Sequence, residues 1–256
     1  MQNTRIISIV NQKGGVGKTT TAINLTAALG LEGKKILLID LDPQGNSTSG
    51  MGVSKKEIKN SVYDILINKT KPEDVIIKTK FKNIDFIPSN VELAGAEVEM
   101  ISIKNRTFLL KEAVEKVKEN YDLILIDCPP SLGILTLNAL TASSSVIIPL
   151  QCEYFALEGL SQLILTMRHV REHYNKELKI SGVLLTMYDG RLKLTMQVVG
   201  EIKKFFAKNI YKTVIPKNVK LSEAPSYGEP ISYYDKTSKG CLAYESLAKE
   251  VIKTAE

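Results

Sequence analysis

The segment with the clearest chemistry is the glycine-rich run from Asn11 to Thr20, which reads NQKGGVGKTT. It follows an apolar stretch and precedes residues with helical spacing, so it should join a strand to a helix N-terminus. Glycines let backbone N–H groups turn inward around phosphate oxygens, and the helix end adds free donors. The last lysine of such a loop reaches the β- and γ-phosphates, and the next hydroxyl binds Mg²⁺. The run predicts a site for ATP and Mg²⁺ made by Lys13, Gly14, Gly15, Val16, Gly17, Lys18, Thr19 and Thr20.

The loop departs from the usual Walker A pattern, which has a glycine five residues before Gly17. That position is Gln12, and Lys13 opens a K-G-G-x-G-K-T-T pattern instead. This pattern resembles the deviant Walker A ATPases, a group that includes the ParA/Soj, MinD and nitrogenase iron-protein relatives. In that group the extra lysine crosses a dimer interface to the partner's phosphates. The resemblance therefore implies an ATP-dependent homodimer and a P-loop NTPase fold of the deviant Walker A (SIMIBI) type.

Carboxylates follow two further apolar runs. Asp40 and Asp42 end the first run, and alternate residues of an extended chain lie on the same side. Asp127 ends the run LILID, the form of a Walker B motif that holds Mg²⁺ through a water molecule. The resemblance implies that Asp42 positions the attacking water, and that Asp40 supports the hydration shell of the metal and the loop. The predicted catalytic residues are thus Lys13, Lys18 and Asp42, and the predicted metal residues are Thr19, Asp40 and Asp127.

Short apolar runs alternate with helical patterns along all 256 residues. Strands are predicted at residues 5–10, 35–39, 84–87, 123–126, 146–149, 180–186 and 211–215. Helices are predicted at residues 19–31, 92–101, 106–119, 157–174, 194–208 and 238–253. This alternation predicts an α/β fold, a mostly parallel twisted sheet with helices on both faces and ligands at the carboxyl ends of its strands. No linker-like stretch interrupts it, so residues 1–256 are expected to be a single domain.

Composition excludes several classes of protein. The first apolar run, residues 6–10, is too short for a signal peptide or a membrane span. Three widely spaced cysteines predict free thiols in a reducing cytoplasm, and Cys128 is expected to be a packing residue. His169 and His173 lie four residues apart on a predicted helix, but without an evident third ligand they are interpreted as surface residues.

Three downstream segments resemble the ParA/Soj family specifically. They read PLQCEYFALEGL from residue 149, GVLLTM from residue 182 and VIPKNVKLSEAPS from residue 214. With the phosphate loop, the resemblance spans nearly the whole chain. It implies that adenine lies near Met187, Pro216 and Asn218, where a side-chain amide can read the base edge. The alternative for Asn218 is a turn residue, because asparagine is a favoured turn former.

The positive charge is concentrated near the C-terminus. The net charge is +6, and residues 202–220 hold six lysines and no acidic residue. Such a stretch indicates either a polyanionic partner or a solvated lysine-rich face. The ParA/Soj resemblance implies sequence-independent DNA binding by Arg191, Lys217 and Lys220. Lys220 stands where arginine is common in relatives, so it keeps the charge but loses the bidentate geometry.

The resemblance as a whole implies a chromosome-partitioning ATPase. ATP would close the homodimer, the dimer would bind DNA, and a ParB-type activator would stimulate an otherwise slow, Mg²⁺-dependent hydrolysis through its N-terminal segment. Release from DNA would then drive segregation of the chromosome origin. The expected location is cytoplasmic and associated with the nucleoid.

Three rival functions share parts of this pattern. A MinD-like division-site regulator would need a basic amphipathic tail, but Leu247, Val251 and Ile252 have ordinary core spacing, so no stable membrane association is expected. An iron-protein relative would need cysteines placed to share an iron–sulfur cluster, and the three cysteines of this sequence show no such placement. A non-catalytic nucleotide-binding scaffold would not need Lys13, Asp42 and Asp127.

Overall fold

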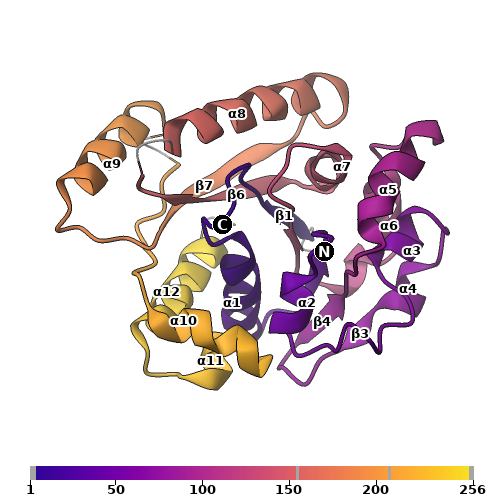
Figure 1. Ribbon diagram of the computed structural model, residues 1–256, viewed down its shortest axis with the longest axis horizontal. Helices are drawn as coiled ribbons and strands as arrows, with labels where there is room; N and C mark the ends of the chain where they lie inside the picture. The colour runs from indigo at the N-terminus through magenta and orange to yellow at the C-terminus, as the bar shows by residue number, and fades with distance from the viewer. Residues whose placement is uncertain (1–3, 154–155, 207–208, 254–256) are drawn as a thin grey trace.

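The computed structural model describes residues 4–153, 156–206 and 209–253. These residues form a seven-stranded sheet in the order β3-β4-β2-β5-β1-β6-β7 (Figure 1). All neighbouring strands are parallel except β3 and β4, which confirms the predicted mostly parallel α/β fold. The strands are β1 (Arg5–Ile9), β2 (Ile36–Asp40), β3 (Ile77–Lys78), β4 (Ile84–Ile87), β5 (Leu123–Asp127), β6 (Ser145–Gln151) and β7 (Lys179–Thr186).

The register of the central strands brings the predicted motifs to one edge of the sheet. Every residue of β2 and β5 is buried, as expected for parallel strands covered on both faces. Asp127 pairs with Ile9 at the end of β1 and with Asp40 at the end of β2. The phosphate loop and the two acidic strand ends therefore lie side by side.

Helices cover both faces of the sheet. Their bounds are α1 (Lys18–Leu31), α2 (Asn46–Gly50), α3 (Val62–Leu66), α4 (Pro72–Val75), α5 (Leu93–Glu99), α6 (Leu109–Glu115), α7 (Ile134–Ala142), α8 (Ala156–His173), α9 (Lys193–Phe206), α10 (Val219–Glu223), α11 (Ile231–Tyr234) and α12 (Lys239–Lys253). Three 3-10 helices are η1 (Met100–Ser102), η2 (Lys118–Asn120) and η3 (Ala224–Tyr227). Figure 1 shows α1 and α12 side by side on one face, with α7 and α8 on the other. Alternate residues of β2 point into two hydrophobic cores, one on each face of the sheet. Leu37 and Ile39 pack with α5–α8, and Ile36 and Leu38 pack with α1 and α12.

The predicted strand at residues 211–215 is wrong. Isolated bridges flank this segment, Val183 with Ile210 and Tyr188 with Pro216, but no strand forms between them. The N–H groups of Lys212 and Thr213 instead donate to the two carboxylate oxygens of Glu250, at 2.7 and 3.0 Å. A side chain from α12 thus takes donors that a sheet ladder would use.

Several helices differ from their predicted bounds. The helix predicted at 106–119 is divided into α6 and η2, and α7 was not predicted. Most residues of α7 are buried, so its sequence lacks the polar face that marks a helix. Lys208, the predicted end of the helix at 194–208, lies outside the described residues.

The C-terminal helix packs on the domain, as its spacing predicted. Leu247 and Val251 of α12 are fully buried in the core that contains α1. Within the described residues, no helix combines the length and the apolar character needed to cross a bilayer.

Candidate functional site

The phosphate loop leaves β1 and enters α1 through two glycines in left-handed conformation. Gly15 has φ 75° and Gly17, the residue before α1, has φ 88°. A Cβ would strain both positions, which explains the glycines. The Val16 carbonyl between them accepts a hydrogen bond of 2.8 Å from the Thr186 hydroxyl at the end of β7. The loop is therefore tied to the end of β7.

The start of the loop is fixed by Asn11. Its Nδ2 donates to the Pro149 carbonyl at 2.8 Å, and its Oδ1 accepts from the N–H of Lys13 at 3.0 Å. The side chain of Lys13 forms an ion pair with Glu153 of the same chain. Lys13 is half-buried and does not line the cleft described below. Its predicted contact with a partner's phosphates stays a prediction.

Lys18 places its charge inside the loop. It is 7% exposed, and its Nζ donates to the Lys13 carbonyl at 3.1 Å. Burial lowers the pKa of Lys18, while the nearby carboxylates of Asp127 and Asp42 raise it. A buried cation with one neutral acceptor suits the phosphate oxygens that the sequence predicts here.

Asp40 has its oxygens engaged by protein donors. Oδ2 accepts from the N–H and the hydroxyl of Thr48, at 2.8 and 2.7 Å, and Oδ1 accepts from the N–H of Asp42 at 3.1 Å. Complete burial, and then the charge of Asp127, raise the pKa of Asp40. These contacts hold the segment after β2 in place, which is the loop-supporting part of its predicted role. Its predicted support of the metal's hydration shell stays a prediction.

Asp127 is the carboxylate best suited to a metal. It is fully buried, and its Oδ2 accepts from the Ser47 hydroxyl at 2.7 Å. Oδ1 accepts no hydrogen bond from any described residue, although the Thr19 hydroxyl is near enough to lower the pKa of Asp127. Burial has the larger effect and raises that pKa. An unpartnered carboxylate oxygen beside a hydroxyl fits a hydrated Mg²⁺.

No group of three or more histidine, cysteine or acidic residues that could hold a metal occurs in the described parts of the chain. His169 and His173 lie on α8, and the centroids of their rings are 4.4 Å apart.

Cys128 is fully buried, and burial raises the pKa of its thiol. That burial agrees with its interpretation as a packing residue.

Asp42 reaches the edge of a cleft of about 450 Å³, a suitable volume for a small-molecule ligand. Its Oδ1 accepts from the N–H of Gln44 at 2.9 Å, which fixes the carboxylate. Most predicted nucleotide contacts line this cleft: Gly14, Gly15, Gly17, Lys18, Thr19, Thr20, Met187, Pro216 and Asn218. Val16 lies buried behind it. The predicted phosphate and adenine regions thus form one continuous cavity.

Asn218 combines the two roles considered from the sequence. It is the N-cap of α10, and its Oδ1 accepts from the N–H of Lys220 at 2.8 Å. It also lines the cleft, with its amide nitrogen left to donate to a base. Met187 also lines the cleft and has φ 47°, an uncommon conformation for a residue other than glycine.

Sequence reasoning missed several lining residues. These are Gln44, Asn46, Pro130, Thr186, Ile215, Leu221, Ser222 and Tyr244. Some lie beside predicted positions, so extending the motifs by a residue or two would have found them. Tyr244 comes from α12, and no local signal connects it with the loop. Its hydroxyl lies 3.2 Å from that of Thr21 in α1.

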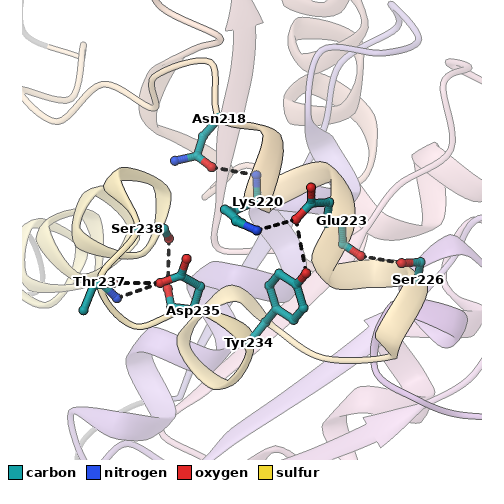
Figure 2. A network of polar contacts seen from close by, with 8 residues as sticks. All are labelled: Asn218, Lys220, Glu223, Ser226, Tyr234, Asp235, Thr237 and Ser238. Carbon is teal, nitrogen blue, oxygen red and sulfur yellow. Dashed lines mark hydrogen bonds and ion pairs between the residues drawn. The ribbon is translucent and has the colours of Figure 1, made fainter.

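The three predicted DNA contacts differ in their surroundings, and their contact with DNA stays a prediction. Lys217 lines the nucleotide cleft. Arg191 is exposed and forms an ion pair with Asp189 at 2.7 Å. Lys220, on the outer side of α10, forms an ion pair with Glu223 at 2.8 Å (Figure 2).

Comparisons with known proteins agree with this geometry. A family model described as an AAA domain matches residues 4–180. The sporulation initiation inhibitor protein Soj of Bacillus subtilis (strain 168) is 58% identical over 96% of this chain and 98% of its own. The chromosome-partitioning ATPase Soj of Treponema pallidum (strain Nichols) is 51% identical over 97% of each chain. The structure of cobyrinic acid a,c-diamide synthase from Mycobacterium smegmatis with bound ADP and magnesium has a TM-score of 0.86 at 36% identity, covering 98% of this chain and 94% of that one.

Proposed function

Because the chain belongs to the ParA/Soj family of deviant Walker A ATPases, we propose that it is a chromosome-partitioning ATPase. The main supporting observation is that the phosphate loop and Asp42 line one cleft at the edge of the sheet where Asp127 ends its strand. The Treponema relative is itself a chromosome-partitioning ATPase, and the mycobacterial structure holds ADP and magnesium in the same fold. ATP and Mg²⁺ are accordingly the ligands of this cleft.

Different residues bind the phosphates, hold the metal and position the attacking water. Backbone N–H groups of the loop and the buried Lys18 bind the phosphates, and Thr19 and Asp127 hold Mg²⁺. When bound, the metal neutralises charge on the phosphates. Asp42 accepts a hydrogen bond from water and orients its oxygen toward the γ-phosphorus, which yields ADP and phosphate. Phosphoryl transfer depends mainly on positioning and charge, so no histidine base is needed. Turnover is slow until an activator improves this positioning.

The ATP-bound state is a homodimer. Lys13 lies at the loop but outside the cleft of its own chain, where its charge can reach a neighbouring subunit's nucleotide. In the monomer it pairs with Glu153, so dimer formation exchanges that carboxylate for the partner's phosphates.

The dimer binds DNA through Arg191 and Lys220, with Lys217 at the boundary between DNA and nucleotide. Two half-sites joined in one particle bind more tightly than either alone, which couples DNA binding to ATP. Phosphate contacts carry no sequence preference, so any chromosomal DNA serves. A ParB-type activator stimulates hydrolysis, the dimer separates, and the cycle moves the chromosome origin. The protein is then cytoplasmic and associated with the nucleoid.

The direct test is the Asp42→Ala variant. It should bind ATP, form a stable dimer and remain on DNA, while phosphate release falls by about 10²-fold or more because the water is no longer positioned. Gel filtration with ATP or ADP, with and without a DNA fragment, measures the dimer and the complex. Lys18→Ala is the matched control, since it should bind no nucleotide and stay monomeric. Normal ATP turnover by Asp42→Ala would show that the water assignment is wrong.

A MinD-like membrane role is the alternative. Such a protein needs an amphipathic helix free to enter a bilayer surface. The apolar residues Leu247 and Val251 of α12 are instead buried against the domain. Flotation of the protein on anionic vesicles with ATP would favour the MinD-like role.

A further inference from the structure

Two cations assigned to DNA are each paired with a carboxylate of their own chain. The Nε and Nη2 atoms of Arg191 donate to the two oxygens of Asp189, at 2.9 and 2.7 Å. The Nζ of Lys220 donates to Oε2 of Glu223 at 2.8 Å. A bidentate guanidinium–carboxylate pair has the same form as a guanidinium–phosphate pair. The carboxylates therefore occupy the positions that DNA phosphates would take.

The Lys220–Glu223 pair is built into α10. The two residues lie three apart on the helix, so their side chains share a face. Figure 2 shows that Oε2 of Glu223 also accepts from the hydroxyl of Tyr234, at 3.1 Å. The Nζ of Lys220 lies 5.7 Å from the centre of the Tyr234 ring. The tyrosine thus contacts both members of the pair and holds the carboxylate toward the lysine.

The Arg191–Asp189 pair is held by a turn. Besides the two side-chain contacts, the N–H of Arg191 donates to Oδ1 of Asp189 at 3.1 Å. These donors lower the pKa of Asp189 to about 2, and Lys220 and Tyr234 lower the pKa of Glu223. Both carboxylates are therefore ionised at neutral pH.

We infer that Asp189 and Glu223 are built-in competitors of DNA, which neutralise Arg191 and Lys220 until phosphates displace them. This inference rests on the proposed DNA-binding function. Exposed ion pairs of this kind are worth a factor of about two to five in an equilibrium constant. Each pair lowers the DNA affinity of a half-site by about that factor, and every half-site contains both pairs. The competitors thereby lower the affinity of the monomer for DNA, and they lower that of the dimer more, because the dimer carries them twice.

The test replaces each carboxylate with its amide, in Glu223→Gln and Asp189→Asn. DNA affinity is measured with ATP by the fluorescence anisotropy of a labelled duplex of arbitrary sequence, over a series of salt concentrations. Each variant should bind about two- to fivefold more tightly per half-site, and about four- to twenty-five-fold as a dimer that carries the change twice. The gain should shrink as salt rises, because salt screens the competing pair.

Glu115→Gln is the control for net charge. Glu115 forms an ion pair with Lys118 at the same i,i+3 spacing, at 2.6 Å. It belongs to α6, which Figure 1 shows on the opposite side of the molecule from α10. A second control combines Glu223→Gln with Lys220→Ala, because without the lysine the carboxylate has no cation to mask. In that background Glu223→Gln should improve affinity no more than Glu115→Gln does.

The outcomes separate this inference from the proposed function. ATP-dependent dimer formation confirms that each variant folds, and the two sites provide independent tests. If wild-type protein binds DNA with ATP but both amide variants bind like Glu115→Gln, the competitor role is overturned. Weaker binding by the amide variants also overturns it, since the carboxylates would then position the cations. A wild-type dimer that binds no DNA overturns the proposed DNA-binding function itself.

Discussion

At the scale of single residues, the two buried aspartates on neighbouring strands differ in what surrounds them. Asp40 accepts hydrogen bonds on both oxygens, from Thr48 and from the backbone of Asp42. Asp127 keeps one oxygen without a donor among the described residues. Asp40 thus serves the structure of the loop, and Asp127 is the carboxylate that we propose for Mg²⁺.

This difference predicts how substitutions at Asp40 change the stability of the protein. Asp40→Ala should lower the free energy of unfolding by about 1–3 kcal/mol, because the buried N–H of Thr48 loses its acceptor on Asp40. Asp40→Asn should lose less, since its amide oxygen still accepts from Thr48. Urea unfolding monitored by circular dichroism measures both variants. An Asp40→Ala protein as stable as wild type would show that these contacts do not stabilise the fold.

At the scale of elements, α10 joins two functions across five residues. Leu221 and Ser222 line the nucleotide cleft, while Lys220 and Glu223 form the ion pair on the outer side. Asn218 caps the helix and lines the cleft as well. A change in the first turn of α10 should therefore affect both stability and nucleotide binding.

Asn218→Ala tests that connection. Loss of the cap should cost about 1 kcal/mol of stability, and loss of the amide should weaken ATP binding. The matched control is Ser61→Ala, which removes the cap of α3, a helix that does not line the cleft. It should lose similar stability and bind ATP normally, as measured by urea unfolding and by titration with a fluorescent ATP analogue. Equal ATP affinity in both variants would contradict an adenine contact by Asn218.

At the scale of the whole molecule, the proposed switch is the change from monomer to dimer. Lys13 pairs with Glu153 in the single chain, and the loop around it is already shaped by Asn11 and Thr186. The proposed dimer requires Lys13 to exchange Glu153 for the partner's phosphates.

Lys13→Ala should bind ATP but remain monomeric, because no cation reaches the partner's phosphates. Analytical ultracentrifugation with ATP, in the Asp42→Ala background to prevent hydrolysis, measures the dimer directly. Lys204→Ala, which removes a surface lysine paired with Glu201, is the control and should dimerise normally. Dimers of Lys13→Ala would exclude the role across the interface.

The sequence was most informative where the chemistry is local. The phosphate loop and the acidic strand ends lie in short consecutive segments, so spacing alone predicted their place at one edge of the sheet. The strand prediction for residues 211–215 failed because Glu250, far along the chain, accepts hydrogen bonds from two of their N–H groups. Tyr244 was missed in the cleft for the same reason, since only tertiary packing brings α12 to the loop. Lys217, which the resemblance assigns to DNA, also lines the cleft, and its DNA contact stays a prediction.

The attachment of α12 has a consequence for how the protein is made. Arg5 at the start of β1 donates to the carbonyl of Val251 at 2.8 Å, and Tyr244 lies against Thr21 while lining the nucleotide cleft. A nascent chain still lacking α12 would already carry the entire glycine-rich loop, but not the helix that packs behind it. Secure capture of nucleotide should thus begin only when α12 has left the ribosome, so growing chains would not dimerise during translation.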